Sequence, residues 1–303
     1  MKILISGASG LVGTSLTKLL EQEGHAVGRL VRPGGKLSAG DVCWDPVART
    51  LDTGAIEGMD AFVHLSGASI AGGRWTPARK ALLRSSRVDS TRMLVDALAG
   101  LRHKPRAFVC ASATGYYGDR GDETLTESSG PGEDFLAQLA RDWEAEATRA
   151  EHAHIRTVRL RFGIVLAAQG GALPRMLLPF KLGVGGCFGN GRQWMSWVAL
   201  EDAVRAARLA IVSDTVSGPV NVVAPNPVRN AEFVRTLAGV LSRPAIFSAP
   251  ALLLRLALGE MADPLLLASQ RVHPEQLLAR KFDFHFADLP TALKTMLITP
   301  VPN

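Results

Sequence analysis

Three glycines near the N-terminus have the spacing of a phosphate-binding turn. Gly7, Gly10 and Gly13 lie three residues apart, after the apolar run of residues 3–5 and before leucines at helical spacing. A strand that leaves such a turn as a helix brings free N–H groups and the positive end of the helix dipole to a pyrophosphate. The pattern predicts a dinucleotide site, the alternative being a chance glycine turn. Its expected cofactor contacts are Gly7, Ser9, Gly10, Leu11, Val12 and Gly13.

The end of the next predicted strand indicates which dinucleotide binds. Residues 25–31 form this strand, which ends at Val31 and is followed by Arg32. Folds that bind NAD place a carboxylate about twenty residues past the glycines, where it holds the ribose 2′-OH. This chain has none there, and the donor fork of an arginine suits a 2′-phosphate. We therefore expect NADP(H), with Val31 and Arg32 as contacts, the alternative being that Arg32 is only a surface residue.

Strand ends further along the chain supply more candidate contacts. Residues 60–65 and 107–111 predict two buried strands, each followed by small or hydroxyl-bearing residues. In a doubly wound sheet the cofactor lies across this carboxyl edge. The expected contacts here are Leu65, Ser66, Gly67, Val109 and Ser112. His64 lies within its strand, so we interpret it as packed or hydrogen-bonded and not as a base.

Three hydroxyl groups after the strand of residues 107–111 are the candidate catalytic groups. Ser112 and Thr114 are placed to orient a substrate carbonyl, and Tyr116 can act as an acid or a base. The alternative for the two smaller residues is a hydrogen bond to backbone at the strand end. The alternative for Tyr116 is a packing role.

Strands that alternate with helices position these groups. Helices are predicted from residue 77 onward and over 135–151, 200–212 and 250–261, with strands over 41–44, 156–166 and 220–223. Asn230 is a candidate cap for a further helix that ends near residue 241. This order predicts an α/β fold with a Rossmann-type doubly wound parallel sheet and a smaller, mixed C-terminal substrate-side domain. We expect the cofactor domain over 1–168 plus 198–224, and the substrate-side domain over 169–197 plus 225–303.

Composition narrows the class of protein. The chain has 303 residues, of which 47% are hydrophobic, and a net charge of +6. Its basic residues are dispersed and lack interleaved aromatic platforms, so we expect no nucleic-acid partner. No apolar stretch is long enough for a membrane span, and we expect no membrane partner. Cys43, Cys110 and Cys187 are far apart, which predicts no disulfide, no metal site and a cytoplasmic protein.

Several segments together resemble an extended short-chain dehydrogenase/reductase. They are the glycine turn, Ser-Ala-Thr-Gly-Tyr-Tyr-Gly at 112–118 and Arg-Phe-Gly-Ile-Val-Leu at 161–166. In the last segment we expect Arg161 and Val165 to contact the cofactor. A narrower match is to an atypical branch of the "NAD-dependent epimerase/dehydratase" type, sometimes mislabelled a cell-division inhibitor, which carries a C-terminal domain of unknown function. The segments that carry this match are 65–70, 74–75, 86–88, 177–183, 189–193, 259–263, 282–284 and 292–293.

The resemblance also exposes a missing pair of residues. Members of that superfamily use a Tyr-x-x-x-Lys pair on one helix face, in which the lysine lowers the pKa of the tyrosine. This chain has only two tyrosines, Tyr116 and Tyr117, and Arg120 and Gly121 lie four residues beyond them. The matching places on the predicted helix are apolar, at Leu136 and Ala140. The resemblance further implies that one of the two tyrosines packs while the other lines the nicotinamide end.

The segment around residue 195 bears on the substrate. Sugar-nucleotide relatives carry a pyrophosphate-binding arginine here, and the matching place in this chain is Met195. Trp194, Met195 and Trp197 predict an apolar wall, unless both tryptophans belong to the core. We therefore expect an NADP(H)-binding oxidoreductase or epimerase-like enzyme of unknown small-molecule substrate, as a monomer or homodimer. The alternative function is a non-catalytic NADP(H)-binding sensor or scaffold.

Overall fold

The computed structural model describes residues 1–298, which form two compact units. The first unit comprises residues 1–113, 139–161 and 204–220. The second comprises residues 114–138, 162–203 and the described residues from 221 on. The chain thus passes between the units several times. Within the described part of the chain, no helix is both long and apolar enough to cross a bilayer.

The first unit is built on a large sheet whose strand order is β14-β8-β6-β5-β1-β2-β3-β4. Neighbouring strands from β6 to β3 pair in parallel, and only the short β4 is antiparallel to β3. The order reverses at β1, which lies between β2 and β5, and this confirms the predicted doubly wound α/β fold. The strands are β1 (Lys2–Ser6), β2 (Ala26–Val31), β3 (Val42–Asp45), β4 (Thr50–Leu51), β5 (Ala61–His64), β6 (Ala107–Ala113), β8 (Arg156–Phe162) and β14 (Gly218–Val222).

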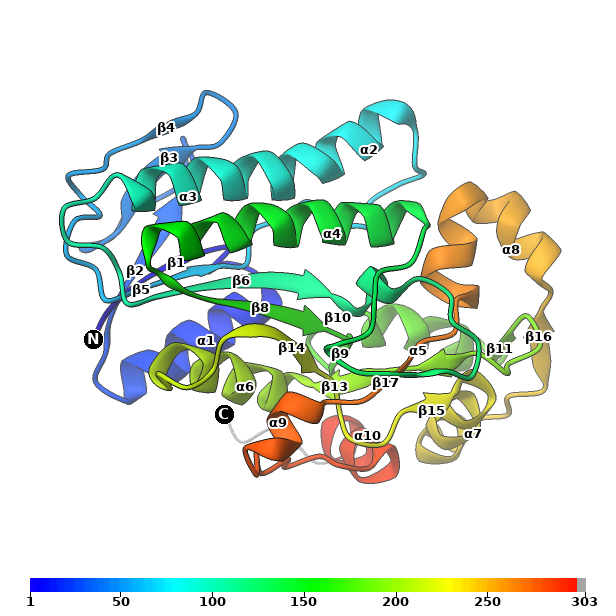
Figure 1. Ribbon diagram of the computed structural model, residues 1–303. Helices are drawn as coiled ribbons and strands as arrows, with labels where there is room; N and C mark the ends of the chain where they lie inside the picture. The colour runs from blue at the N-terminus through cyan, green and yellow to red at the C-terminus, as the bar shows by residue number, and fades with distance from the viewer. Residues whose placement is uncertain (299–303) are drawn as a thin grey trace. The chain divides into compact units, whose positions relative to one another are not determined.

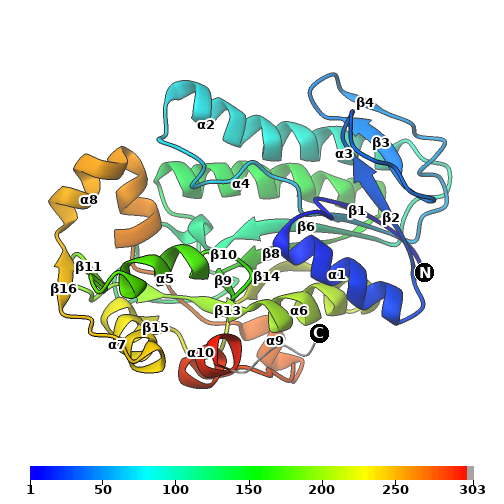
Figure 2. The same ribbon diagram turned by 180° about the vertical axis from the view of Figure 1, so that it is seen from behind.

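Helices cover both faces of this sheet (Figures 1 and 2). Helices α2, α3 and α4 lie on one face, and α1 and α6 lie on the other. The two layers explain why residues 3–5 of β1 are apolar without alternation, since all three are fully buried. The helices are α1 (Leu11–Gln22), α2 (Pro77–Arg84), α3 (Ser90–Ala99), α4 (Phe135–Thr148) and α6 (Leu200–Val212).

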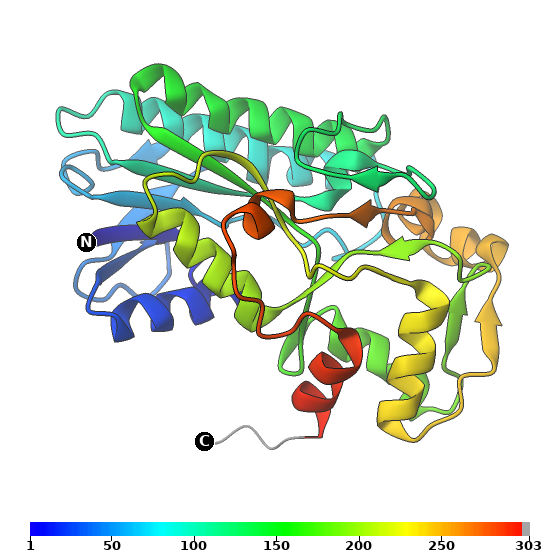
Figure 3. The ribbon, with the colours of Figure 1, turned by 60° about the horizontal axis from the view of Figure 1, so that its bottom comes forward.

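The second unit combines short strands with five helices of the described chain. Its strands are β7 (Thr124–Leu125), β9 (Ile164–Ala167), β10 (Gly170–Gly171), β11 (Gly186–Phe188), β12 (Trp194–Met195), β13 (Trp197–Ala199), β15 (Val228–Arg229), β16 (Phe247–Ala249) and β17 (Arg271–Val272). Its helices are α5 (Leu173–Lys181), α7 (Asn230–Leu241), α8 (Ala251–Leu258), α9 (Glu275–Ala279) and α10 (Leu289–Leu297). Helices α7 and α10, yellow and red in Figure 3, pack together over a core that includes Trp197, Leu237 and Leu293.

Three local expectations are wrong. The strand predicted over 156–166 breaks at Gly163 into β8 and β9, which belong to different sheets, and a Cβ on Gly163 would lie 2.5 Å from the Ser196 carbonyl oxygen. Asn230 does not cap α7, because its amide accepts a bond from the Phe188 N–H. The apolar wall at 194–197 does not form, because Met195 and Trp197 are core residues and only Trp194 is half-buried.

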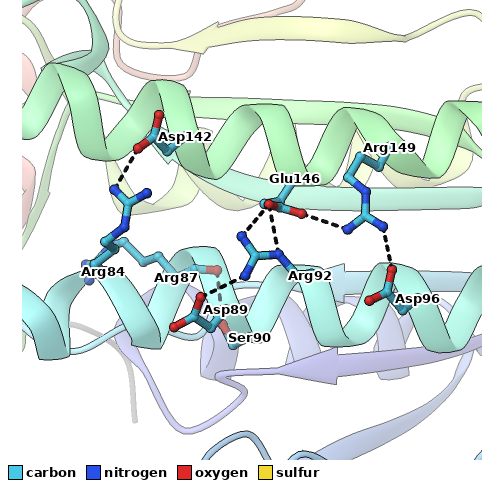
Figure 4. A network of polar contacts seen from close by, with 9 residues as sticks. All are labelled: Arg84, Arg87, Asp89, Ser90, Arg92, Asp96, Asp142, Glu146 and Arg149. Atoms are coloured by element: carbon cyan, nitrogen blue, oxygen red, sulfur yellow. Dashed lines mark hydrogen bonds and ion pairs between the residues drawn. The ribbon is translucent and has the colours of Figure 1, made fainter.

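Charged side chains link α4 to α2 and α3 in the first unit (Figure 4). Glu146 on α4 accepts hydrogen bonds from Arg92 Nη2 at 2.6 Å and from Arg149 Nη1 at 2.8 Å. Arg149 also reaches Asp96 on α3 at 2.7 Å. Burial alone would raise the pKa of Glu146, but the hydrogen bonds from both arginines bring that pKa below its usual value. The network therefore stabilises the fold while Glu146 is ionised.

We expect Glu146→Gln to lower the free energy of unfolding by about 1 kcal/mol at pH 7, since the pair is partly exposed. A folded-state pKa below the unfolded value gives stability that is complete above the unfolded pKa, about 4.3 for glutamate. The difference between wild type and variant should shrink as pH falls through the folded pKa. Urea unfolding in a pH series from 7 to 3, which extends below the unfolded pKa, measures this difference. Glu151→Gln, at an exposed glutamate, is the matched control, and an equal effect of both variants would contradict the network.

Candidate cofactor site

The glycine turn is the point where three stretches of backbone approach one another. Gly7 has a φ of +74°, and a Cβ there would lie 2.7 Å from the Leu65 carbonyl carbon and 2.8 Å from the Ser66 nitrogen. A Cβ on Gly13 would lie 2.2 Å from the Gly7 carbonyl oxygen. No side chain fits at either position. The turn therefore packs α1 closely against β1 and against the end of β5.

The N-terminus of α1 fits an anion. Its N-cap is Gly10, which offers no side chain to the first N–H groups, and the first turn of the helix has no acidic residue. Ser9 and Gly10 are exposed, while Leu11 and Val12 are half-buried. Helix N–H groups without a capping side chain, together with the helix dipole, form a binding position for phosphate. These are the cofactor contacts that the sequence predicts for the turn.

Two arginines on the neighbouring strand have different surroundings. Arg29, within β2, forms an ion pair with Asp41 and donates from Nε to its Oδ1 at 3.0 Å. Arg32 lies one residue beyond Val31, the last residue of β2, and is exposed. Within residues 1–298, no carboxylate pairs with Arg32. The predicted contact of Arg32 with a cofactor at the carboxyl edge of the sheet stays a prediction.

A wide helical turn holds the end of β5. Residues Ser85–Asp89, between α2 and α3, form a π-helical turn, a rare conformation that is frequent at functional sites. Ser86 Oγ accepts the Ala68 N–H at 3.1 Å, and Arg87 Nη2 donates to the Ala68 carbonyl at 2.9 Å. A Cβ on Gly67 would lie 3.0 Å from Arg87 Cζ. The predicted contacts Leu65, Ser66 and Gly67 are therefore held between this turn and the glycine turn.

Arg87 is a site residue for which the sequence predicts no role. Its guanidinium also lies 5.4 Å from the Trp143 ring centroid, and no carboxylate of the described residues pairs with it. Burial, and then the charge of Arg79, lower the pKa of Arg87 to about 10, so it remains charged at neutral pH. A signal was present in the sequence, because none of the residues three or four positions away from Arg87 is acidic. An unmatched cation next to Gly67 favours a negative ligand at this edge.

His64 is a structural residue, as the sequence indicates. Its side chain is fully buried, with Nδ1 2.5 Å from Ser6 Oγ and Nε2 3.2 Å from Ser90 Oγ. Burial lowers the pKa of His64 to about 3, which keeps the imidazole neutral. The ring therefore joins β1, β5 and α3 and is not placed to act as a base.

Ser112 belongs to a buried charged cluster. Its hydroxyl donates to Glu144 Oε1 at 2.6 Å, and Arg161 binds both carboxylate oxygens of Glu144, from Nε at 2.7 Å and from Nη2 at 2.8 Å. Ser112 and Arg161 are each 3% exposed, and Val109 is fully buried in β6. Arg161 thus has a carboxylate partner within the protein. The sequence analysis predicts no role for Glu144, although a carboxylate four residues after Ala140, on an otherwise apolar helix face, indicates a buried charge.

The other predicted site residues belong to the second unit. Thr114 and Tyr116 lie on a short 3-10 helix, where Thr114 is buried and Tyr116 is half-buried. Tyr117 is fully buried, and its hydroxyl lies 2.7 Å from Asn221 Oδ1. Tyr117 is therefore the tyrosine that packs. Val165 is half-buried in β9.

Leu136 and Ala140 both lie on α4, one turn apart. Leu136 is half-buried near Gly115, where a Cβ would lie 3.4 Å from the leucine Cβ. Ala140 is 5% exposed. Neither side chain can transfer a proton.

The comparisons with known proteins agree in one family. The model of the NAD dependent epimerase/dehydratase family matches residues 3–223, and a domain of unknown function matches residues 249–296. Epimerase family protein ML0860 of Mycobacterium leprae is 40% identical over 99% of this chain and 97% of its own length. Human epimerase family protein SDR39U1 is 34% identical over 98% of this chain and 100% of its own length.

Two solved structures share the fold over nearly the whole chain. A crystal structure of human SDR39U1 with NADPH has a TM-score of 0.90 and 32% identity, covering 99% of this chain and 100% of that one. The nucleoside-diphosphate sugar epimerase of Corynebacterium glutamicum has a TM-score of 0.81 and 36% identity. That alignment covers 98% of this chain and 58% of the other.

Substitutions in the Glu144 cluster can distinguish two roles of Arg161, which are to neutralise Glu144 and to bind the cofactor. If the arginine chiefly neutralises Glu144, Arg161→Met leaves a buried charge unmatched and should lower the free energy of unfolding by about 3–5 kcal/mol. Adding Glu144→Gln removes that charge and should recover part of the loss. Urea unfolding at pH 7 measures both variants. A single variant of normal stability that binds NADPH weakly would instead assign Arg161 to the cofactor.

Proposed function

Because the chain belongs to the NAD-dependent epimerase/dehydratase family, we propose that it binds NADP(H) and acts as an oxidoreductase or epimerase-like enzyme on a small-molecule substrate. The cofactor domain of this proposal comprises 1–168 plus 198–224, and the remaining residues are assigned to the substrate side. The likeness to human SDR39U1, solved with NADPH, supports the choice of cofactor.

The observation that carries the proposal is the guanidinium of Arg32. It follows the last residue of the strand next to the glycine turn, and no described carboxylate competes for it. An arginine at that place can bind a 2′-phosphate with two parallel hydrogen bonds. The turn itself, with the free N–H groups of α1, receives the pyrophosphate. Arg87, which is half-buried next to Gly67, adds a positive charge at this edge.

The nicotinamide ring supplies hydride chemistry when the cofactor is bound. The chain's own contribution is to bind, orient and exclude water. In the structure the Ser112 hydroxyl donates its one hydrogen bond to Glu144, so its oxygen can only accept a further hydrogen bond. It can thus orient a substrate hydroxyl more readily than polarise a carbonyl. Thr114 and Tyr116 are the remaining candidates for proton transfer.

One observation favours a second function, that of a non-catalytic NADP(H)-binding sensor or scaffold. The resemblance to the superfamily matches Leu136 and Ala140 to the places where its members hold their proton-transferring tyrosine and lysine. A sensor needs the cofactor site and no acid or base.

We expect NADPH to raise the melting temperature more than NADH does at equal concentration, because only NADPH uses Arg32.

Arg32→Ala should weaken NADPH binding about ten-fold or more, the value of a charge-assisted hydrogen bond, and leave NADH binding nearly unchanged. Calorimetric titration measures both affinities. Lys18→Ala, at an exposed lysine of α1, is the control. Equal losses for the two cofactors would show that Arg32 does not read the 2′-phosphate.

We also expect no epimerisation of UDP-glucose, because the chain has no Tyr-x-x-x-Lys pair to remove the hydroxyl proton. Proton NMR of the sugar after incubation with cofactor-loaded protein tests this, and galactose signals would overturn it.

For any substrate found in a screen, Tyr116→Phe should lower kcat with NADPH affinity unchanged if Tyr116 transfers the proton. Full activity of that variant would remove Tyr116 from the candidates.

A further inference from the structure

A pocket of about 220 Å³ lies wholly within the second unit and is not part of the proposed cofactor site. The side chains at its wall that can bind a ligand are those of Thr124, Trp194, Asn226, Arg271 and His273. No lining residue is acidic. The volume is below the ~300–1,000 Å³ of pockets that enclose drug-sized ligands. The pocket therefore suits a small ligand and does not suit a dinucleotide.

Paired strands make this wall rigid. Thr124 of β7 pairs with Arg271 of β17, and Trp194 of β12 pairs with Arg229 of β15. The two ladders are joined where the Gln270 N–H donates to the Trp194 carbonyl at 3.1 Å. Two prolines, at positions 225 and 227, complete the wall. A pocket built on such backbone needs little reordering when a ligand enters.

Two arginines contact the ring of Trp194. The guanidinium carbons of Arg229 and Arg271 lie 4.5 Å and 4.8 Å from its centroid. Asp122 accepts the indole N–H at 2.8 Å and an Arg229 N–H at 2.9 Å. Hydrogen bonds from Trp194 and then Arg229 lower the pKa of Asp122. Asp122 is thus ionised and accepts hydrogen bonds from Arg229 and the indole.

Arg271 acts on Asp122 only through its charge, which lowers the pKa of Asp122 less than the hydrogen bonds from Trp194 and Arg229 do. The Arg271 side chain is exposed, and no carboxylate among residues 1–298 forms an ion pair with it. Asn226 is held in place by its own amide, which donates to the Ala287 carbonyl at 3.0 Å. His273 is anchored through its main chain, with its N–H on the Leu125 carbonyl at 2.8 Å. The pocket therefore combines a net positive charge with a fixed amide, a hydroxyl and an imidazole.

We propose that this pocket binds a small metabolite through a carboxylate or phosphate group, with Arg271 as the principal contact. The guanidinium fork matches both oxyanions. Thr124 and His273 supply hydrogen bonds around it, and the stacking on Trp194 orients the fork. The site gives the second unit a ligand of its own, in addition to the cofactor proposed for the first.

Tryptophan fluorescence of the whole protein, without NADPH, tests the proposal, because a ligand on Arg271 changes the surroundings of the Trp194 ring. Inorganic phosphate and succinate are the two probes, each compared with sodium chloride at equal ionic strength. We expect saturable binding of at least one probe, and the preferred probe distinguishes phosphate from carboxylate ligands. Trp194→Phe should remove the fluorescence change.

Arg271→Gln should weaken binding about ten-fold or more, as expected for the loss of a charge-assisted hydrogen bond. Arg243→Gln makes the same charge change at another exposed position of the second unit and should have no effect. Equal affinity in Arg271→Gln and wild type, or no saturable binding of either probe to wild type, would overturn the proposal. NADPH binding by all these variants reports separately on the cofactor site.

Discussion

The carboxyl edge of the large sheet depends on a steric constraint at Gly7. Three backbone segments, those of the turn, α1 and the end of β5, meet within distances that exclude a Cβ at Gly7 and at Gly13. This contact sets where the first N–H groups of α1 lie relative to Leu65 and Ser66. The π-helical turn at Ser85–Asp89 holds the same β5 segment from another side through Ala68. The strand end is therefore fixed before any ligand arrives.

The arginines of the chain divide into two electrostatic classes. Arg29, Arg161 and Arg229 each have a carboxylate partner, in Asp41, Glu144 and Asp122. These pairs join neighbouring elements within one unit. By contrast, Arg32, Arg87 and Arg271 form no ion pair with a carboxylate within the described chain, although the charge of Arg271 also acts on Asp122. Since an unmatched cation is costly when buried and attracts anions when exposed, this second class marks where negative ligands are to be sought.

The sequence was sufficient for the fold and for the glycine turn, because both depend on local patterns. An unalternating apolar run, glycines at spacing three and alternating strands and helices each have a direct physical meaning. What the sequence could not show were contacts between distant residues. Glu144 meets Ser112 and Arg161 only after α4 packs beside β6 and β8, and no spacing encodes that meeting. Gly163 likewise looks like one residue of a continuous strand until the neighbouring Ser196 backbone is present.

The π-helical turn at Ser85–Asp89 makes the length of the chain here as important as its composition. Such a turn contains one more residue than an α-helical turn. Deleting a single residue would restore regular α-helical winding and, because the wide turn takes up the extra residue, would change mainly the directions of the side chains within the turn. Ser86 and Arg87 could not then both reach Ala68. In a related protein, a one-residue gap between positions 85 and 89 would thus indicate that the segment after β5 lacks these contacts, even where every motif residue is unchanged.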